Sequence, residues 1–244
     1  MKICVAQTRP VKGDIHHNLD VHYKLIQLAL AHDTEVIVFP ELSLTGYEPE
    51  LAASLAVDEN ADIFDHLQEL SDKFGITIGV GMPKKLNVGV SISTIIFQPQ
   101  HIRQVYSKKY LHKSETQHFT TNESFNGLIG PLKDIALGIC YEMSIPEHFE
   151  DIAATTASFY INSSVKDHES LGRSYGKMAD AARGLKLTTL LANCVGTTGG
   201  YDCPGGSAIW DNNGELLHHL VSEHEGILIY DTVSKEIFEK YLES

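Results

Sequence analysis

Short apolar runs of strand length alternate with longer amphipathic stretches in the first third of the chain. The runs "ICVAQ" and "VIVFP" are each followed by an amphipathic segment, over about residues 18–32 and residues 61–74. This alternation is typical of strand–helix units packed around a buried sheet. It predicts an α/β fold.

The pattern changes after the run "ITIGVGMP". The strand-like runs "SISTIIFQP" and "HIRQVYSKKYL" are joined by a turn at Pro99, which predicts a hairpin. The strands "IALGI", "ASFYIN" and "TLLANC" then alternate with helices that start near Ser144 and span about residues 172–187. A second hairpin turns at residues 211–214, and "GILIYD" is a last strand before a short C-terminal helix. Because no repeat or linker interrupts the chain, we predict one domain over residues 1–244 with mixed sheets.

Composition narrows the possible partners. The 244 residues carry a net charge of −13, and no basic run could neutralise a phosphate backbone, so we expect neither nucleic acid nor an anionic membrane as a partner. No apolar stretch approaches the roughly 20 residues that span a bilayer, and the start "MKICVAQTRP" is too short and polar for a secretory signal. We therefore expect a cytoplasmic protein.

Cysteine and histidine usage gives no sign of a metal site. The four cysteines lack a CxxC pair, so reduced thiols are expected, and the 13 histidines show no metal-ligand spacing. We expect no metal and no cofactor.

Three predicted strands end on residues that can carry chemistry. "VIVFP" leads to Glu41, "RQVYS" to Lys108 and "IALGI" to Cys140. In open α/β folds, ligands collect outside the carboxyl ends of the strands, so these three side chains are predicted to converge.

A glutamate, a lysine and a cysteine form a coherent catalytic set. A thiol is a good nucleophile only as a thiolate; a nearby cation lowers its pKa, and a carboxylate can accept its proton. Attack on a carbonyl or nitrile carbon creates negative charge that needs a fixed cation beside it. This chemistry makes Cys140 the nucleophile, Glu41 the general base and Lys108 the stabilising cation.

The residues after the cysteine predict a helix start. "SIPE" has the spacing of a capping box, with Ser144 as N-cap and Glu147 reaching back, and Pro146 suits a first turn. The positive end of such a helix would favour a thiolate at Cys140.

Other interpretations of the same residues stay open. A free cysteine is often a buried core residue, and a lysine beside Lys109 can be part of a solvated pair. A papain-like dyad could pair Cys140 with one of three histidines. These are His112, His118 and His148.

Taken together, the motifs resemble those of the nitrilase, or carbon–nitrogen hydrolase, superfamily. "FPELSLTGY" is similar to its glutamate motif, "YSKKYL" to its lysine motif and "GICYEMSIPE" to its cysteine motif. The resemblance covers nearly the whole chain, up to "ANCVG" and "GGSAIWDNNGELL". It implies a four-layer α–β–β–α sandwich with two mixed β-sheets.

The resemblance also implies roles for site residues. Glu41, Lys108 and Cys140 correspond to the catalytic triad; Glu115 corresponds to a second glutamate that positions substrate or lysine, and the backbone N–H of Tyr141 to an oxyanion donor. Loops over about residues 47–55, 119–125 and 164–172 are expected to line the pocket.

The implied activity is cofactor-free, cysteine-dependent hydrolysis of a small non-peptide amide through a thioester. The amide would be an ω-amide or an N-carbamoyl amine. Alternatives are a true nitrilase acting on a small nitrile, or a catalytically silent binding protein of the same fold. The helices after the cysteine are expected to form a homodimer or a larger homo-oligomer.

Overall fold

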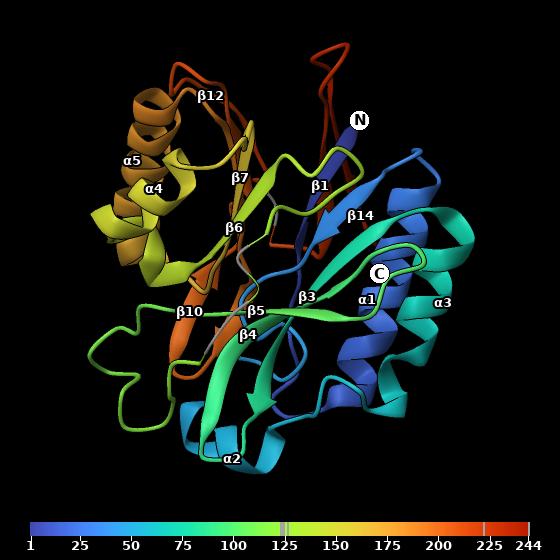
Figure 1. Ribbon diagram of the computed structural model, residues 1–244, viewed down its shortest axis with the longest axis vertical. Coiled ribbons are helices and arrows are strands. Elements are labelled where there is room, and N and C mark those ends of the chain that lie inside the picture. The colour runs from blue at the N-terminus through green and yellow to red at the C-terminus, as the bar shows by residue number, and fades with distance from the viewer. Residues whose placement is uncertain (123–124, 126, 222, 244) are drawn as a thin grey trace.

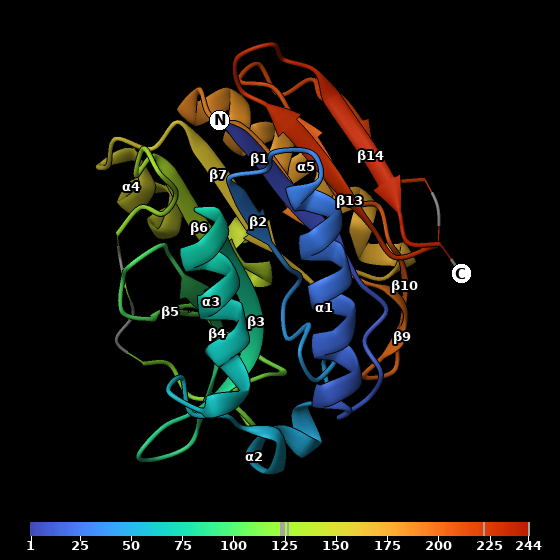
Figure 2. The same cartoon turned by 90° about the vertical axis from the view of Figure 1, so that its right-hand side faces the viewer.

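Two mixed β-sheets face each other, and helices cover both outer faces (Figure 1). The computed structural model describes residues 1–122, 125, 127–221 and 223–243. Helices α4 (Pro146–Ala153) and α5 (His168–Leu185) cover one sheet. Helices α1 (Ile15–Leu30) and α3 (Asp65–Phe74) cover the other, as Figure 2 shows face-on. The predicted four-layer α–β–β–α sandwich is confirmed.

Within the described residues the larger sheet has seven strands in the order β14-β13-β1-β2-β3-β4-β5. Strands β1, β2 and β3 are parallel, and the remaining neighbours are antiparallel. The strands are β1 (Lys2–Gln7), β2 (Val36–Val38), β3 (Thr77–Lys85), β4 (Val90–Phe97), β5 (Gln104–Ser107), β13 (Gly226–Asp231) and β14 (Ile237–Tyr241).

The smaller sheet has five strands among the described residues, in the order β12-β11-β8-β7-β6. Strands β6, β7 and β8 are parallel, and β11 and β12 add an antiparallel hairpin. The strands are β6 (Ile135–Ile139), β7 (Phe159–Ser163), β8 (Thr188–Ala192), β11 (Ala208–Trp210) and β12 (Leu216–His219). A separate ribbon and short helices complete the fold: β9 (Val195–Thr198), β10 (Tyr201–Pro204), α2 (Ala52–Leu55), η1 (Pro49–Leu51), η2 (Asp62–Phe64) and η3 (Cys140–Ser144).

The alternation of side chains along each strand builds the layers. On β1, Ile3 and Val5 pack into the core between the sheets, whereas Cys4 and Ala6 pack against the helices of the outer face. A third cluster, which includes Tyr160, joins the smaller sheet to α4 and α5. Full burial of one such aliphatic side chain contributes about 1.5–3 kcal/mol, so these clusters hold the strand ends in fixed positions.

The two long helices begin earlier than the apolar pattern predicts. Asp14 caps α1 by accepting a hydrogen bond from the backbone N–H of His17 at 3.0 Å. Asp167 caps α5 in the same way through Ser170 at 2.8 Å. Each cap satisfies an N–H that has no partner within the helix, so the helix starts at the cap rather than at the first apolar residue.

Two predictions about local structure are wrong. Ser144 is not the N-cap of α4; it ends η3, and the cap position is Ile145, which has no side-chain cap, before Pro146. The predicted C-terminal helix is strand β14, because the Asp231 carboxylate binds the N–H of Val233 in a turn that returns the chain antiparallel to β13.

Candidate active site

Glu41 lies in a loop that follows β2 and rests against β3. The N–H of Leu44 donates to the carbonyl of Gly81 at 3.0 Å. A Cβ at Gly81 would lie 2.2 Å from the carbonyl oxygen of Pro40 and 2.6 Å from the nitrogen of Leu42, so only glycine lets the loop lie this close. The side chain of Glu41 is buried, and no donor of the described residues reaches its Oε2. That oxygen is therefore unoccupied and able to accept a proton.

Lys108 follows β5 and is fully buried. Its backbone N–H donates to the carbonyl of Ile92 at 2.8 Å. Its Nζ lies 2.8 Å from Glu41 Oε1 and 2.7 Å from Glu115 Oε1. The two carboxylates thus share one ammonium, and this buried trio carries a net negative charge.

Glu115 is held in place by further donors. Its Oε2 accepts from the backbone N–H of His112 at 2.7 Å, and its Oε1 accepts from the hydroxyl of Tyr47 at 3.2 Å. A buried carboxylate needs several such partners, and here they fix its position beside Lys108.

Cys140 occupies a sharp turn between β6 and η3. Its φ of 46° lies in the left-handed region, which is uncommon for a residue other than glycine. Two residues earlier, a Cβ at Gly138 would lie 2.1 Å from the Tyr160 hydroxyl, so this strand end requires glycine for space. The side chain of Cys140 is partly buried, and its Sγ lies 4.0 Å from the carbonyl oxygen of Val165.

The turn at Cys140 is tied to the loop of Lys108 by Glu142, which sequence reasoning missed. This buried carboxylate accepts from the N–H of Ile139 at 2.7 Å, the N–H of Lys109 at 2.7 Å and the hydroxyl of Tyr106 at 2.8 Å. Its position two residues after a candidate nucleophile was the available signal. A carboxylate that bridges two loops cannot be distinguished from a surface one by sequence alone.

One cavity of about 280 Å³ brings most of the predicted site residues together. Glu41, Glu115, Cys140 and Tyr141 line it, whereas Lys108 lies behind its wall, bonded to the two glutamates. The other lining residues are Tyr47, His112, Ser114, Val165, Lys166, Asp167, Glu169, Ser170, Arg173 and Tyr201.

The predicted pocket loops contribute unequally. Residues 47–55 supply Tyr47, and residues 164–172 supply Val165 and several of its neighbours. In the third loop, residues 119–125, positions 123 and 124 lie outside the described residues, and the described positions do not line the cavity.

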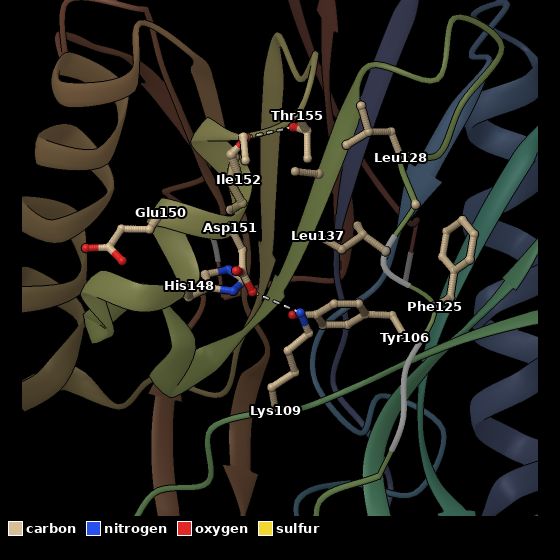
Figure 3. Close-up of a pocket in the computed structure, with 13 residues that line it drawn as sticks. Tyr106, Lys109, Phe125, Leu128, Leu137, His148, Glu150, Asp151, Ile152 and Thr155 are labelled. Carbon is tan, nitrogen blue, oxygen red and sulfur yellow. Dashed lines mark hydrogen bonds and ion pairs between the residues drawn. The ribbon is translucent and has the colours of Figure 1, made fainter.

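A second cavity, of about 430 Å³, lies elsewhere, and Glu41, Lys108 and Cys140 do not line it (Figure 3). Tyr106 and His148 line it, and Lys109 forms an ion pair with Asp151 at 3.1 Å beside them. His148 bonds the hydroxyl of Tyr160 at 3.2 Å, and burial lowers its pKa to about 4. The size of a cavity therefore does not identify the site here; the reactive groups do.

The histidine alternatives find no support in the contacts. No histidine nitrogen of the described chain lies within hydrogen-bond distance of Cys140 Sγ. His148 faces the second cavity, His112 bonds Ser114 Oγ at 2.8 Å, and His118 lines a neighbouring hollow. Within those same residues, no three His, Cys, Asp or Glu side chains are grouped to hold a metal ion, and no helix is long and apolar enough to cross a membrane.

Burial and charge shift the pKa values of Glu41, Lys108 and Cys140. Burial, with Glu115 adding to it, raises the pKa of Glu41 against the opposing effect of Lys108. Burial alone would lower the pKa of Lys108, but Glu41, Cys140 and Glu115 outweigh it and raise that pKa, so the ammonium stays charged.

The pKa of the Cys140 thiol is raised, whereas the sequence led us to expect surroundings that favour a thiolate. Burial and Glu41 raise the pKa of Cys140, and the lowering effects of Lys166 and Lys108 do not compensate. The resting thiol is therefore protonated beside a carboxylate whose own raised pKa makes it a better base. The arrangement suits concerted transfer of the proton to Glu41 during attack.

Comparison with known proteins agrees with this chemistry. The sequence model described as carbon–nitrogen hydrolase matches residues 2–239. A protein of Schizosaccharomyces pombe described as a probable nitrilase is 24% identical over 93% of this chain and 87% of its own length. An (R)-stereoselective amidase of a Pseudomonas species is 26% identical over 89% of this chain and 80% of its own length.

Solved structures share the fold. An amidase from Nesterenkonia sp. AN1 superposes with a TM-score of 0.82 at 24% identity, covering 95% of this chain and 92% of that one. A variant of that amidase solved with butyramide gives 0.82 at 23% identity over 96% and 92%.

Proposed function

Since this chain belongs to the carbon–nitrogen hydrolase family, we propose that it is an amidase-like enzyme whose triad is Glu41, Lys108 and Cys140. The observation that carries the proposal is the ion network of Lys108 with Glu41 and Glu115, at 2.8 and 2.7 Å, next to the cavity that Cys140 lines. Glu115 positions Lys108. The backbone N–H of Tyr141 joins Lys108 in stabilising the negative charge that forms on the substrate.

The first half-reaction forms a thioester. Cys140 Sγ attacks the amide carbon while its proton passes to the free Oε2 of Glu41. The negative charge on the substrate oxygen is stabilised by Lys108 Nζ and the Tyr141 N–H. Glu41 then gives the proton to the leaving nitrogen, and the carbon–nitrogen bond breaks to release ammonia or an amine.

The second half-reaction frees the enzyme. Water attacks the thioester carbon and gives its proton to Glu41, and the tetrahedral intermediate collapses with release of the Cys140 thiolate. Glu41 returns the proton to that sulfur as the carboxylic acid leaves. No cofactor takes part in these steps.

The substrate is a small amide, with ω-amides and N-carbamoyl amines as the candidate classes. A cavity of about 280 Å³ suits a molecule of a few carbon atoms. Two of the similar proteins are described as amidases, and one was solved with butyramide. The same three residues could act on a nitrile, so a true nitrilase is the second candidate, favoured by the probable nitrilase among the relatives.

Assembly and location belong to the same proposal. We propose a single domain over residues 1–244, in the cytoplasm, where free thiols such as its four cysteines stay reduced. A groove between α4 and α5, lined by Ile145, Phe149 and Leu185, supports a homodimer formed through these helices.

Ammonia release from a panel of small amides, N-carbamoyl amines and nitriles tests the activity. We expect release from at least one class, its loss in Cys140→Ala, and a large loss of turnover in Lys108→Met. A histidine–cysteine dyad would tolerate the lysine change. No release from any class, together with a Cys140 that iodoacetamide does not modify, would favour the silent binding protein instead.

A further inference from the structure

The charge balance around Cys140 is incomplete without another cation. Lys108 is shared by Glu41 and Glu115, so these three groups together carry one net negative charge. When the thiol of Cys140 loses its proton to solvent, as it does before alkylation, the thiolate adds a second negative charge. In a partly buried site such an excess is costly unless a further positive charge lies close.

The peptide that joins Val165 to Lys166 lies near the sulfur of Cys140. The sulfur of Cys140 is 4.0 Å from the carbonyl oxygen of Val165, which belongs to the Val165–Lys166 peptide. Lys166 lines the same cavity as Cys140 and Glu41 and is partly buried.

The backbone of Lys166 is fixed by Asn193, a fully buried residue after β8. The Asn193 side chain accepts from the N–H of Lys166 at 2.8 Å and donates to its carbonyl at 3.1 Å. It also donates to the carbonyl of Gly205 at 2.7 Å, and its own N–H donates to Ser207 Oγ at 3.0 Å. The backbone of Lys166 is therefore anchored to the end of the smaller sheet, although it lies in a loop.

Within the described part of the chain, the ammonium of Lys166 forms no hydrogen bond or ion pair with another side chain. Among the described residues, no carboxylate lies within 4.0 Å of it, whereas Arg173, which lines the same cavity, pairs with Glu169 at 3.6 Å. The positive charge of Lys166 is therefore available to the sulfur of Cys140.

We propose that Lys166 is a positioning residue that balances the charge of the Cys140 thiolate and so sets the pH at which the nucleophile reacts. This inference rests on the proposed role of Cys140 as nucleophile. Lys166 acts through the sulfur, whereas Lys108 acts on the substrate oxygen. The site thus divides its positive charge between two lysines.

The electrostatics of the site agree with the geometry. Lys166 lowers the pKa of Cys140, more than Lys108 does, and it also lowers the pKa of Glu41. Other charged or titratable groups face the sulfur or line its cavity, and they are unchanged in the experiment below. They are Glu41, Tyr47, Lys108, His112, Glu115, Tyr141, Tyr160, Asp167, Glu169, Arg173, Lys177 and Tyr201.

The test measures the pH dependence of Cys140 alkylation by iodoacetamide, followed by intact mass, in Lys166→Met, Lys166→Arg and the wild type. The other three cysteines are at most 2% exposed, so the first adduct reports Cys140. We expect Lys166→Met to raise the pH midpoint of Cys140 alkylation by about one unit. At neutral pH, alkylation should then be about tenfold slower than in the wild type. Lys166→Arg should restore most of the rate. The matched control is Lys24→Met, which removes an exposed charge on α1 and should match the wild type.

An unchanged midpoint in Lys166→Met would overturn the proposal. Lys166→Gln repeats the test if the Met variant melts at a lower temperature. An unchanged midpoint with a raised KM only for carboxylate-bearing amides would also overturn it, because Lys166 would then bind substrate. Alkylation of Cys140 does not require turnover. If the pH midpoint of alkylation shifts but the protein hydrolyses no substrate of the panel, this inference holds and the proposed activity fails.

Discussion

The backbone of Cys140 is strained at the position where the sulfur must point into the cavity. Its φ of 46° costs a residue with a Cβ about 1–2 kcal/mol relative to ordinary backbone. The core on both sides of β6 compensates for this cost, and the turn directs the sulfur away from the strand.

This strain gives a prediction about two inactive variants. Glycine has no penalty at positive φ, so Cys140→Gly should be more stable than Cys140→Ala by up to about 1 kcal/mol. Urea unfolding of both proteins checks it. At a position without backbone strain, alanine is more stable than glycine. If Cys140→Ala is the more stable variant, the turn does not keep its positive φ in solution.

Glu142 gives a second prediction at the residue scale. Glutamine cannot accept at both ends, so Glu142→Gln leaves a buried donor unpaired and should lower the free energy of unfolding by about 1–3 kcal/mol. Tyr106→Phe is the matched control, since it removes one of the three hydrogen bonds and should cost about 1 kcal/mol. Equal losses in the two variants would mean that the carboxylate does not bind the two backbone N–H groups as described.

The sequence motifs pointed to the reactive residues and to Glu115, but not to the residues that hold their loops in place. Glu41, Lys108 and Cys140 each end a strand-like run, so their convergence followed from the fold class. Glu142 and Asn193 act through backbone hydrogen bonds to distant loops, and such contacts leave no periodic pattern in a sequence.

At the scale of elements, the contact of β3 with the Glu41 loop predicts a strong effect of one methyl group. In Gly81→Ala the new Cβ would meet the backbone of the loop at 2.2 Å, so the loop must move. A displacement of about 1 Å at a catalytic group can cost 100-fold in rate, so we expect kcat to fall at least tenfold.

The control for this change is Gly176→Ala on α5. Nothing lies within 4 Å of a Cβ there, and alanine favours a helix interior by about 0.5–1 kcal/mol. That variant should melt higher with unchanged kcat. Wild-type kcat in Gly81→Ala would show that the loop yields without moving Glu41.

Two buried histidines on α1 and α4 make stability depend on pH. Burial lowers the pKa of His22 and of His148 from 6.5 to about 4. The unfolded chain therefore binds protons that the folded protein does not between pH 6.5 and 4, so stability falls as the pH falls through this window.

Each histidine should remove about 2 kcal/mol of stability between pH 7 and pH 5. Urea unfolding at the two pH values should show a smaller loss in His148→Gln than in the wild type. His16→Gln, at an exposed position on α1, should lose as much as the wild type. The same loss in all three proteins would contradict the assignment of a neutral buried His148.

The last strand shows where element prediction fails. Residues after β13 are few and mix apolar with charged side chains, which suits a short helix or an edge strand equally. Whether this segment forms a helix or a strand depends on the turn at Asp231 and on the free edge of β13. That edge exists only once the sheet has formed. The strands of the sandwich and the presence of its long helices, though not where those helices begin, were predicted correctly because their own apolar patterns specify them.

At the scale of the whole molecule, the groove between α4 and α5 bears on assembly. Both helices pack on the sheet that holds Cys140, and η3 contacts α5. If two copies meet there, dilution to monomers should loosen the turn and lower specific activity. Size-exclusion chromatography beside rate measurements checks this, and a demonstrable monomer with full specific activity would refute it.

The proposed triad draws on both sheets, and this has a consequence for how the chain acquires reactivity. Glu41 and Lys108 come from one sheet and are 67 positions apart, whereas Cys140 comes from the other. Neither sheet alone can assemble the group. During refolding, secondary structure should therefore return before the Cys140 thiol regains the alkylation rate of the folded protein. The alkylation rate of this sulfur then reports the time at which the two sheets pack together.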